Sequence, residues 1–215
     1  MNKAIVIGGS RGIGKAIADS LSSIGFNVVA TSKNDFDSSD LENVREFIKK
    51  HDETDVLVLN TGGPPTKEFF SVSEDEWMKY HNQLFLSFCI VLQKIKIRND
   101  GYVFLISSSV IKEPTPNLVI SSAYRSAFTS VFKILSKILA EKNISCINIA
   151  PGLIKTDRTK EVIKDLETYQ KTLPMKRIGE PHEIGDFVKA IIENKIKYLS
   201  GVVINFDGAA SNFVY

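Results

Sequence analysis

The chain has 215 residues, of which 43% are hydrophobic and 24% are charged, and its formal net charge is +2. This length suits one well-buried domain over residues 1–215, and the small net charge argues against a nucleic-acid surface. The first predicted strand starts at residue 4, which leaves no room for a signal peptide, and no apolar run reaches membrane-spanning length. We therefore expect a cytoplasmic protein without a nucleic-acid or membrane partner.

Cysteine and histidine residues are too scattered to define a site. Cys89 and Cys146 both lie inside apolar runs and form neither a disulfide framework nor a zinc motif, so we interpret them as small buried side chains. His51, His81 and His182 show no metal-ligand spacing. The sequence therefore predicts no metal.

The first predicted unit is a strand, a glycine turn and a helix. Residues 4–7 are a short apolar run of branched side chains, typical of a strand buried on both faces. Gly8 permits a tight turn, Gly12 lets the main chain approach a diphosphate, and Gly14 lets the next helix pack closely on the sheet. The free N–H groups and the dipole at the start of that helix favour an anion. This order predicts a dinucleotide phosphate site.

The rest of the chain alternates strands and helices. Gly25 suits the C-terminal cap of the first helix, and Ser39–Glu42 and Ser73–Glu76 have the capping-box spacing. Crossovers of helical length between strands imply a Rossmann-type α/β fold, a doubly wound parallel sheet with helices on both faces. The expected strands are 4–7, 26–31, 55–59, 102–107, 144–150 and 202–206, and the expected helices are 13–24, 41–48, 73–95 and 118–141.

Loops at the carboxyl ends of parallel strands are where such a sheet binds ligands. The expected ligand loops are 8–14, 31–34, 60–63, 107–109 and 151–156. Five such loops at one sheet edge form a candidate site.

The end of the second strand discriminates between NAD and NADP, because an acid there accepts from the ribose 2′-hydroxyl whereas basic groups accept a 2′-phosphate. Residues 31–34 read Thr-Ser-Lys-Asn, without an acid, and Arg11 lies in the facing glycine turn. Arg11 and Lys33 together favour NADP(H) over NAD(H). The alternative is that both are ordinary surface charges.

These motifs together resemble those of the short-chain dehydrogenase/reductase family, and the resemblance covers nearly the whole chain. The glycine turn matches the family's cofactor turn, residues 60–63 are similar to its Asn-Asn-Ala-Gly loop, and Pro151-Gly152 with Thr156 is similar to the segment that holds the nicotinamide carboxamide. Residues 177–181 and 201–208 are similar to its closing motifs. Within the family, the motifs are most similar to those of 3-oxoacyl-acyl-carrier-protein reductases. The resemblance implies about seven strands and a small-molecule carbonyl or alcohol substrate.

The cofactor-binding residues predicted from the motifs and the resemblance are Gly8, Ser10, Arg11, Gly12, Ile13, Gly14, Ser32, Lys33, Asp37, Asn60, Gly62, Gly63, Arg125, Pro151, Gly152, Ile154 and Thr156.

The family's chemistry uses a serine, a tyrosine, a lysine and an asparagine. Only the serine has a match at the corresponding position of this sequence. Ser108 fits the serine, but the tyrosine position thirteen residues later is Ser121. The lysine position one helical turn on is Arg125, and the asparagine position is Leu84. A serine hydroxyl is a far weaker acid than a tyrosine, whereas the arginine fork can still bind ribose hydroxyls and stabilise negative charge.

Tyr124 is the alternative acid, about 60° round the helix from Ser121. The catalytic candidates are therefore Ser108, Ser121, Arg125 and Tyr124, although packing of Tyr124 elsewhere on the helix is the simpler interpretation. The residues expected to frame the substrate pocket are 110–119 and 157–173.

Two long helices are apolar on more than one side, at residues 84–92 and 128–138. In the family that the chain resembles, these helices form the subunit interface, so we expect a homodimer or homotetramer. We favour an NADP(H)-dependent oxidoreductase with an altered proton path. The alternative is an NADP(H)-binding sensor or partner subunit without turnover, and dehydratase or epimerase chemistry stays open.

Overall fold

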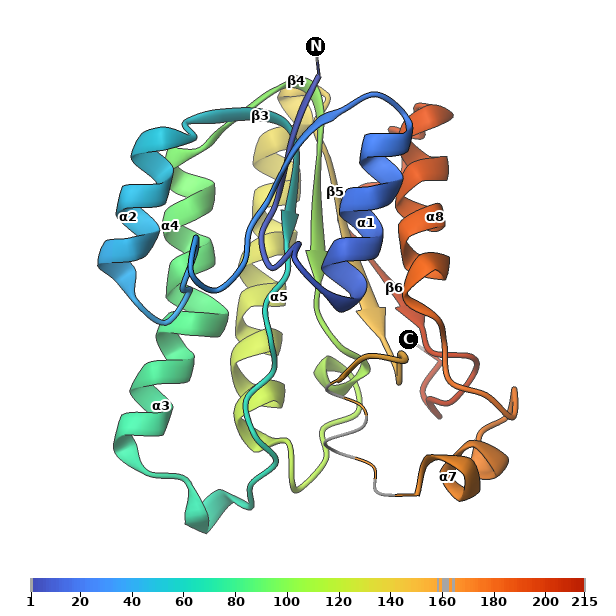
Figure 1. The fold of residues 1–215 in the computed structure, drawn as a ribbon. Helices are drawn as coiled ribbons and strands as arrows, with labels where there is room; N and C mark the ends of the chain where they lie inside the picture. The colour runs from blue at the N-terminus through green and yellow to red at the C-terminus, as the bar shows by residue number, and fades with distance from the viewer. Residues whose placement is uncertain (1, 158, 160–162, 164, 215) are drawn as a thin grey trace.

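The computed structural model describes residues 2–157, 159, 163 and 165–214. Six strands form one sheet in the order β2-β1-β3-β4-β5-β6 (Figure 1). All the neighbouring pairs are parallel, which confirms the predicted doubly wound α/β fold. The strands are β1 Lys3–Val6, β2 Asn27–Ala30, β3 Glu53–Leu59, β4 Lys96–Ile106, β5 Ser145–Pro151 and β6 Val202–Phe206.

Helices cover both faces of the sheet because successive side chains of each buried strand point to opposite faces. Helices α1 (Gly12–Ser23) and α8 (Pro181–Glu193) pack on one face. Helices α2 (Leu41–Lys50), α4 (Ser87–Lys94) and α5 (Val119–Leu139) pack on the other face (Figure 1). The fold therefore has three layers with two apolar cores.

Both cysteines belong to the apolar packing, as expected. Cys146 is fully buried in β5 and Cys89 is half-buried against the same core. Burial raises the pKa of the Cys146 thiol to about 12 and also raises the pKa of Cys89. Both side chains are therefore protonated thiols at neutral pH.

The sheet has six strands in the part of the chain that the structure describes, so the expected number of about seven is corrected. The connection from β2 to α2 covers only residues 31–40. A parallel crossover needs about a dozen residues or more, so this connection cannot hold a further helix and strand. Instead Phe36 is buried and packs edge-on against Phe47, with ring centroids 5.2 Å apart. Strand β2 is consequently an outer strand of the sheet.

Of the two capping boxes predicted at helix N-termini, the structure contains one. Ser73 caps α3 (Glu74–His81) and exchanges hydrogen bonds with Glu76, as predicted. The box predicted at residues 39–42 is wrong, because Asp40 caps α2 and accepts from the main-chain N–H groups of the second and third helical residues.

The helix predicted over residues 73–95 is interrupted. A π-helical turn, η2 (Asn82–Leu86), separates α3 from α4. Single π turns recur at functional sites, because they change the direction in which the inserted side chains project. Two helices near the C-terminus, α7 (Leu166–Thr172) and α8, were absent from the sequence-based elements. Across residues 2–157, 159, 163 and 165–214, none of the helices combines the length and the apolar character needed to cross a membrane.

Candidate functional site

The glycine turn after β1 is built as the sequence predicts. Gly8 has a φ of +63°, which favours glycine. A Cβ on Gly14 would lie 2.0 Å from the Gly8 carbonyl oxygen, so only glycine fits where α1 approaches the turn. Thr31 Oγ1 accepts from the Gly8 N–H at 3.0 Å, and Asn60 Nδ2 donates to the Gly8 carbonyl at 3.0 Å. The neighbouring strand ends therefore fix the turn.

The N-terminus of α1 is open to an anion. Its N-cap residue Arg11 makes no side-chain capping bond, and the first turn of the helix contains no acidic residue. The turn lines a cleft of about 580 Å³ along the carboxyl edge of the sheet. A diphosphate fits this donor set, because main-chain N–H groups and the helix dipole both favour negative charge.

The cleft collects all the predicted cofactor residues that the five loops supply, except Gly14, which packs behind the turn. Its lining includes Gly8, Ser10, Arg11, Gly12, Ile13, Ser32, Lys33, Asp37, Asn60, Gly62, Gly63, Arg125, Pro151, Gly152, Ile154 and Thr156. A Cβ on Gly62 or on Gly63 would meet nothing within 4 Å, so both face open space.

The loop after β2 carries two acids, Asp35 and Asp37, close behind residues 31–34. Asp37 folds back to Lys33, with 3.6 Å between Nζ and a carboxylate oxygen. Asp35 accepts hydrogen bonds from Ser32. The statement that this strand end lacks an acid is therefore true of residues 31–34 alone.

Gln83 is a cleft residue that sequence reasoning missed. It lies in the π-helical turn η2 and lines the cleft. Its Nε2 donates to the Gly62 carbonyl at 2.8 Å and to Thr61 Oγ1 at 3.3 Å, whereas Leu84 is buried in the packing between helices. The sequence did offer a sign of this role, because Gln83 directly precedes Leu84, the position at which the family that the chain resembles has an asparagine.

Arg125 is a buried cation on α5, only 9% exposed, that lines the cleft. Its Nη1 donates to the carbonyls of Ile106 at 3.1 Å and Ser107 at 3.3 Å, and its Nη2 donates to the Thr61 carbonyl at 3.4 Å. Its Nε donates to Ser121 Oγ at 3.2 Å. Burial lowers the pKa of Arg125 to about 10, so the guanidinium is still charged at neutral pH.

The guanidinium of Arg125 has one donor left for a ligand. Of its five N–H donors, four make the contacts above, which leaves one N–H on Nη2 among the described residues. The side chain thus connects the ends of β3 and β4 to α5 and presents a positive charge to the cleft.

The serines near Arg125 have different environments. Ser107 Oγ donates to Asn148 Oδ1 at 2.5 Å and is buried in the sheet. Ser108 lines the cofactor cleft and also a second cavity. Ser121 lines the cleft and has its Oγ beside the Arg125 guanidinium. Ser108, Ser121 and Arg125 are therefore brought together around one end of the cleft.

Tyr124 is corrected as a catalytic candidate, because the structure does not bring it into the cleft. Its hydroxyl donates to the Trp77 carbonyl at 3.0 Å, and its ring packs against Trp77 and His81. Burial raises the pKa of Tyr124, which makes it a poorer acid still. The simpler interpretation, that Tyr124 packs elsewhere on α5, describes its position.

Tyr124→Phe should leave dinucleotide affinity unchanged within about twofold, because the hydroxyl lies outside the cleft. Loss of its hydrogen bond should lower the free energy of unfolding by about 1 kcal/mol. Urea denaturation and a fluorescence titration with NADPH measure the two effects. Tyr198→Phe is the matched control, since Tyr198 is fully exposed. A tenfold loss of NADPH affinity or of turnover in Tyr124→Phe would contradict this placement.

A second cavity of about 900 Å³ adjoins the cleft at Ser108. Of the two segments expected to frame the pocket, residues 110–119 contribute Val110, Glu113, Thr115, Asn117 and Leu118 to its lining, and residues 157–173 contribute Ile163, Tyr169 and Leu173. Residues 158, 160–162 and 164 of the second segment lie outside the described residues. Residues 205–211, which comprise the last two residues of β6 and the segment after it, form a further wall of the cavity. The sequence did not indicate this wall. The cavity is the candidate substrate pocket, because it meets the cofactor cleft where the two serines and Arg125 lie.

A parallel sheet with a glycine turn at its switch point and a ligand cleft along its carboxyl edge defines a dinucleotide-binding α/β protein. Residues 37–210 match the profile of the family described as enoyl-(acyl carrier protein) reductase. A 3-oxoacyl-[acyl-carrier-protein] reductase FabG of Chlamydia trachomatis serovar D is 30% identical over 240 aligned positions, with 95% of both chains covered. The chain therefore belongs to the short-chain dehydrogenase/reductase family, and it is an oxidoreductase of that type.

Solved structures show the same fold at lower sequence identity. YwfH, described as an NADPH dependent reductase involved in bacilysin biosynthesis, superposes with a TM-score of 0.88 at 23% identity over 99% of both chains. The angucycline C-6 ketoreductase LanV, solved with bound NADP, gives a TM-score of 0.88 at 19% identity, with 97% of this chain and 95% of that chain covered.

Proposed function

We propose that this protein is an NADP(H)-dependent reductase or dehydrogenase that acts on a small carbonyl or alcohol compound. The observation that carries the proposal is the junction of the cofactor cleft with the second cavity at Ser108, beside the buried Arg125. A substrate at such a junction would lie within reach of both a cofactor and polar side chains. Relatives and fold neighbours named as reductases support the same chemistry.

Bound NADPH would supply the hydride. Arg125 would bind a nicotinamide ribose hydroxyl through its open Nη2 N–H, and its charge would stabilise the oxyanion that develops on the substrate. Ser108 would donate a hydrogen bond to that oxygen from the junction of the two cavities.

The proton path would run through Ser121. Its Oγ accepts from Arg125 Nε, so its own O–H is available to donate, and the adjacent charge stabilises the alkoxide form. Gln83 would keep the loop at Thr61 and Gly62 in place beside Arg125. When the Ser121 hydroxyl gives its proton to the substrate oxygen, water in the cleft would return a proton to Ser121. Serine is a weak acid, so this return would have to accompany the transfer.

A carbonyl panel tests this function. NADPH oxidation is followed at the nicotinamide absorbance with ketones, aldehydes and thioester-linked 3-oxo compounds. Turnover on at least one compound, lost in Ser108→Ala, is expected. Tight NADPH binding without turnover on any compound would favour the second candidate, a nucleotide-binding sensor or partner subunit. The observation that favours that candidate is that residue 121, where the resemblance places the family's tyrosine, is a serine.

Arg11 and Lys33 would hold the 2′-phosphate. Arg11→Asp should weaken NADPH binding by about 30-fold, because it replaces an attraction with a repulsion, and should weaken NADH binding by less than about threefold. Fluorescence titrations of both cofactors measure this difference. Lys94→Asp is the control, with the same charge change at the end of α4. Equal effects of Arg11→Asp on NADPH and NADH would exclude the proposed phosphate site.

The protein would act as a homodimer or homotetramer. Ile134 and Ile138 on α5 are 61% and 60% exposed, and Phe85, Cys89 and Ile90 are only partly buried. An apolar strip of this kind is typical of a subunit interface. We propose that the protein is cytoplasmic, where it would draw on the NADPH pool.

A further inference from the structure

The outer edge of β2 offers main-chain groups to another strand. Among the described strands, β2 pairs with β1 alone. The N–H groups of Asn27 and Thr31 donate to carbonyls of the β1 segment at 2.8 and 3.0 Å. Main-chain groups of successive strand residues point to opposite sides, so the N–H and C=O groups of Val28 and Ala30 point away from β1. Two donors and two acceptors are therefore open at this edge.

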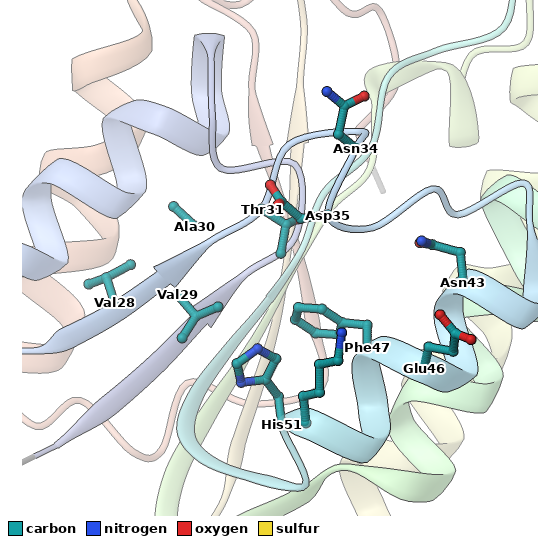
Figure 2. Close-up of a pocket in the computed structure, with 11 residues that line it drawn as sticks. Val28, Val29, Ala30, Thr31, Asn34, Asp35, Asn43, Glu46, Phe47 and His51 are labelled. Atoms are coloured by element: carbon teal, nitrogen blue, oxygen red, sulfur yellow. The ribbon is translucent and has the colours of Figure 1, made fainter.

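A hollow of about 520 Å³ adjoins the edge, between β2 and α2 (Figure 2). Val29 is half-buried and packs against the same apolar core as Phe47 of α2, which also lines the hollow. A strand added beside β2 would point every second side chain to this face of the sheet. The hollow thus gives room to a side chain of a further strand.

The sequence of β2 lacks the features that commonly protect an edge strand. Exposed edges are usually blocked by a charged side chain, a proline or a bulge. Strand β2 reads Asn-Val-Val-Ala, without a charge or a proline, and its pairing with β1 has no register shift. Such an edge favours pairing with another strand.

We propose that β2 pairs antiparallel with β2 of a second copy of this chain, across a two-fold axis at Val29. In this register Val28 of each copy lies opposite Ala30 of the other, and their outward N–H and C=O groups form four hydrogen bonds. Val29 of each copy faces Val29 of the other on the α2 side of the sheet. The contact is closed, because each copy uses the same surface.

The charges that line the hollow complement one another in this arrangement. Helix α2 leads from the end of β2 back to the parallel strand β3, so it runs antiparallel to β2. Asp35 and Glu46 therefore lie nearer the end of β2, and Lys50 lies nearer its start. The two-fold axis reverses this order, so the acids of one copy face Lys50 of the other. Glu46 and Lys50 are both exposed in the single chain, which leaves them accessible to the second copy.

A disulfide across the axis tests the pairing. Opposed residues of a non-hydrogen-bonded antiparallel pair have Cα atoms about 4.5 Å apart, a distance that a disulfide spans. Under mild oxidation with oxidised glutathione, Val29→Cys should therefore become a covalent dimer, measured on a non-reducing gel. Asn27→Cys is the matched control, because it is more exposed but lies two residues from the axis. Its two copies would be about 13 Å apart.

The comparison of these variants decides the proposal. We expect Val29→Cys to be trapped at least about tenfold faster than Asn27→Cys, since a gap of about 13 Å is too long for a disulfide. The unchanged chain, which keeps Cys89 and Cys146, should give no covalent dimer under the same conditions. Trapping of Asn27→Cys at the rate of Val29→Cys would indicate random collision and overturn the proposal, as would a folded Val29→Cys that is not trapped.

A charge exchange on α2 is the second test, and it leaves β2 unchanged in shape. In the Val29→Cys background, Glu46→Lys should slow trapping by about tenfold at low salt, because two attractions become repulsions. Adding Lys50→Glu should restore the rate to within about threefold. Glu193→Lys is the control, with the same charge change on an exposed residue of α8. Failure of the double exchange to restore trapping would overturn the proposal. Neither test needs a dinucleotide, so both are independent of the proposed function.

Discussion

Gly14→Ala should abolish dinucleotide binding and destabilise the fold. The new methyl group would lie 2.0 Å from the Gly8 carbonyl oxygen and 2.8 Å from Asn60 Nδ2. Main-chain atoms cannot rotate away, so α1 must move off the turn that it closes. We expect the free energy of unfolding to fall by about 3 kcal/mol and the melting temperature by about 6–12 °C.

Gly14→Ala should weaken dinucleotide binding as well as the fold. A shift of α1 moves the N–H groups that face the diphosphate, and affinity for NADPH should fall by more than about 100-fold. Calorimetry and a fluorescence titration measure the two effects. Gly63→Ala is the control for stability, because its methyl group would meet nothing within 4 Å. Wild-type melting of Gly14→Ala would show that the turn and α1 are not packed as described.

Arg125→Met should remove most of the activity while leaving the protein folded. Methionine fills a similar volume but leaves the carbonyls of Ile106, Ser107 and Thr61 without this donor. Loss of these bonds is offset by removal of a buried charge, so the free energy of unfolding should fall by only about 2 kcal/mol. The rate of carbonyl reduction should fall by about 100-fold or more, and NADPH affinity by about tenfold.

A double-mutant cycle shows whether Arg125 acts through Ser121. Because Arg125 Nε lies 3.2 Å from Ser121 Oγ, Ser121→Ala and Arg125→Met should not be additive. The rate of the double variant should be close to that of Arg125→Met. Arg125→Lys is the conservative control, since an ammonium restores the charge but cannot contact all the carbonyls at once. Full additivity would mean that the two side chains act independently.

The glycine turn and the meeting of the five loops were largely predictable from the sequence. The requirement for glycine at residues 8 and 14 is local, because it follows from a main-chain turn between adjacent elements. Parallel strands place their carboxyl ends at one edge, so the alternation of elements was enough to predict that the five loops meet. The Ser73 cap was predictable for the same reason, since both partners lie within one helical turn.

The surroundings of Arg125 and of the second cavity were much less predictable. Gln83 enters the cleft through a π-helical turn, and Tyr124 leaves it by bonding to Trp77. The wall over residues 205–211 reaches the second cavity from a part of the chain distant in sequence. Each of these placements depends on side-chain direction or on packing between distant segments, and periodicity reports neither.

The sequence by itself determined the fold class and the glycine turn between β1 and α1. Local main-chain requirements and the strand and helix periods carry that information. Only the tertiary structure decided that Arg125 is buried against three carbonyls. These hydrogen bonds join α5 to segments distant in sequence, so their geometry depends on how α5 packs on the sheet.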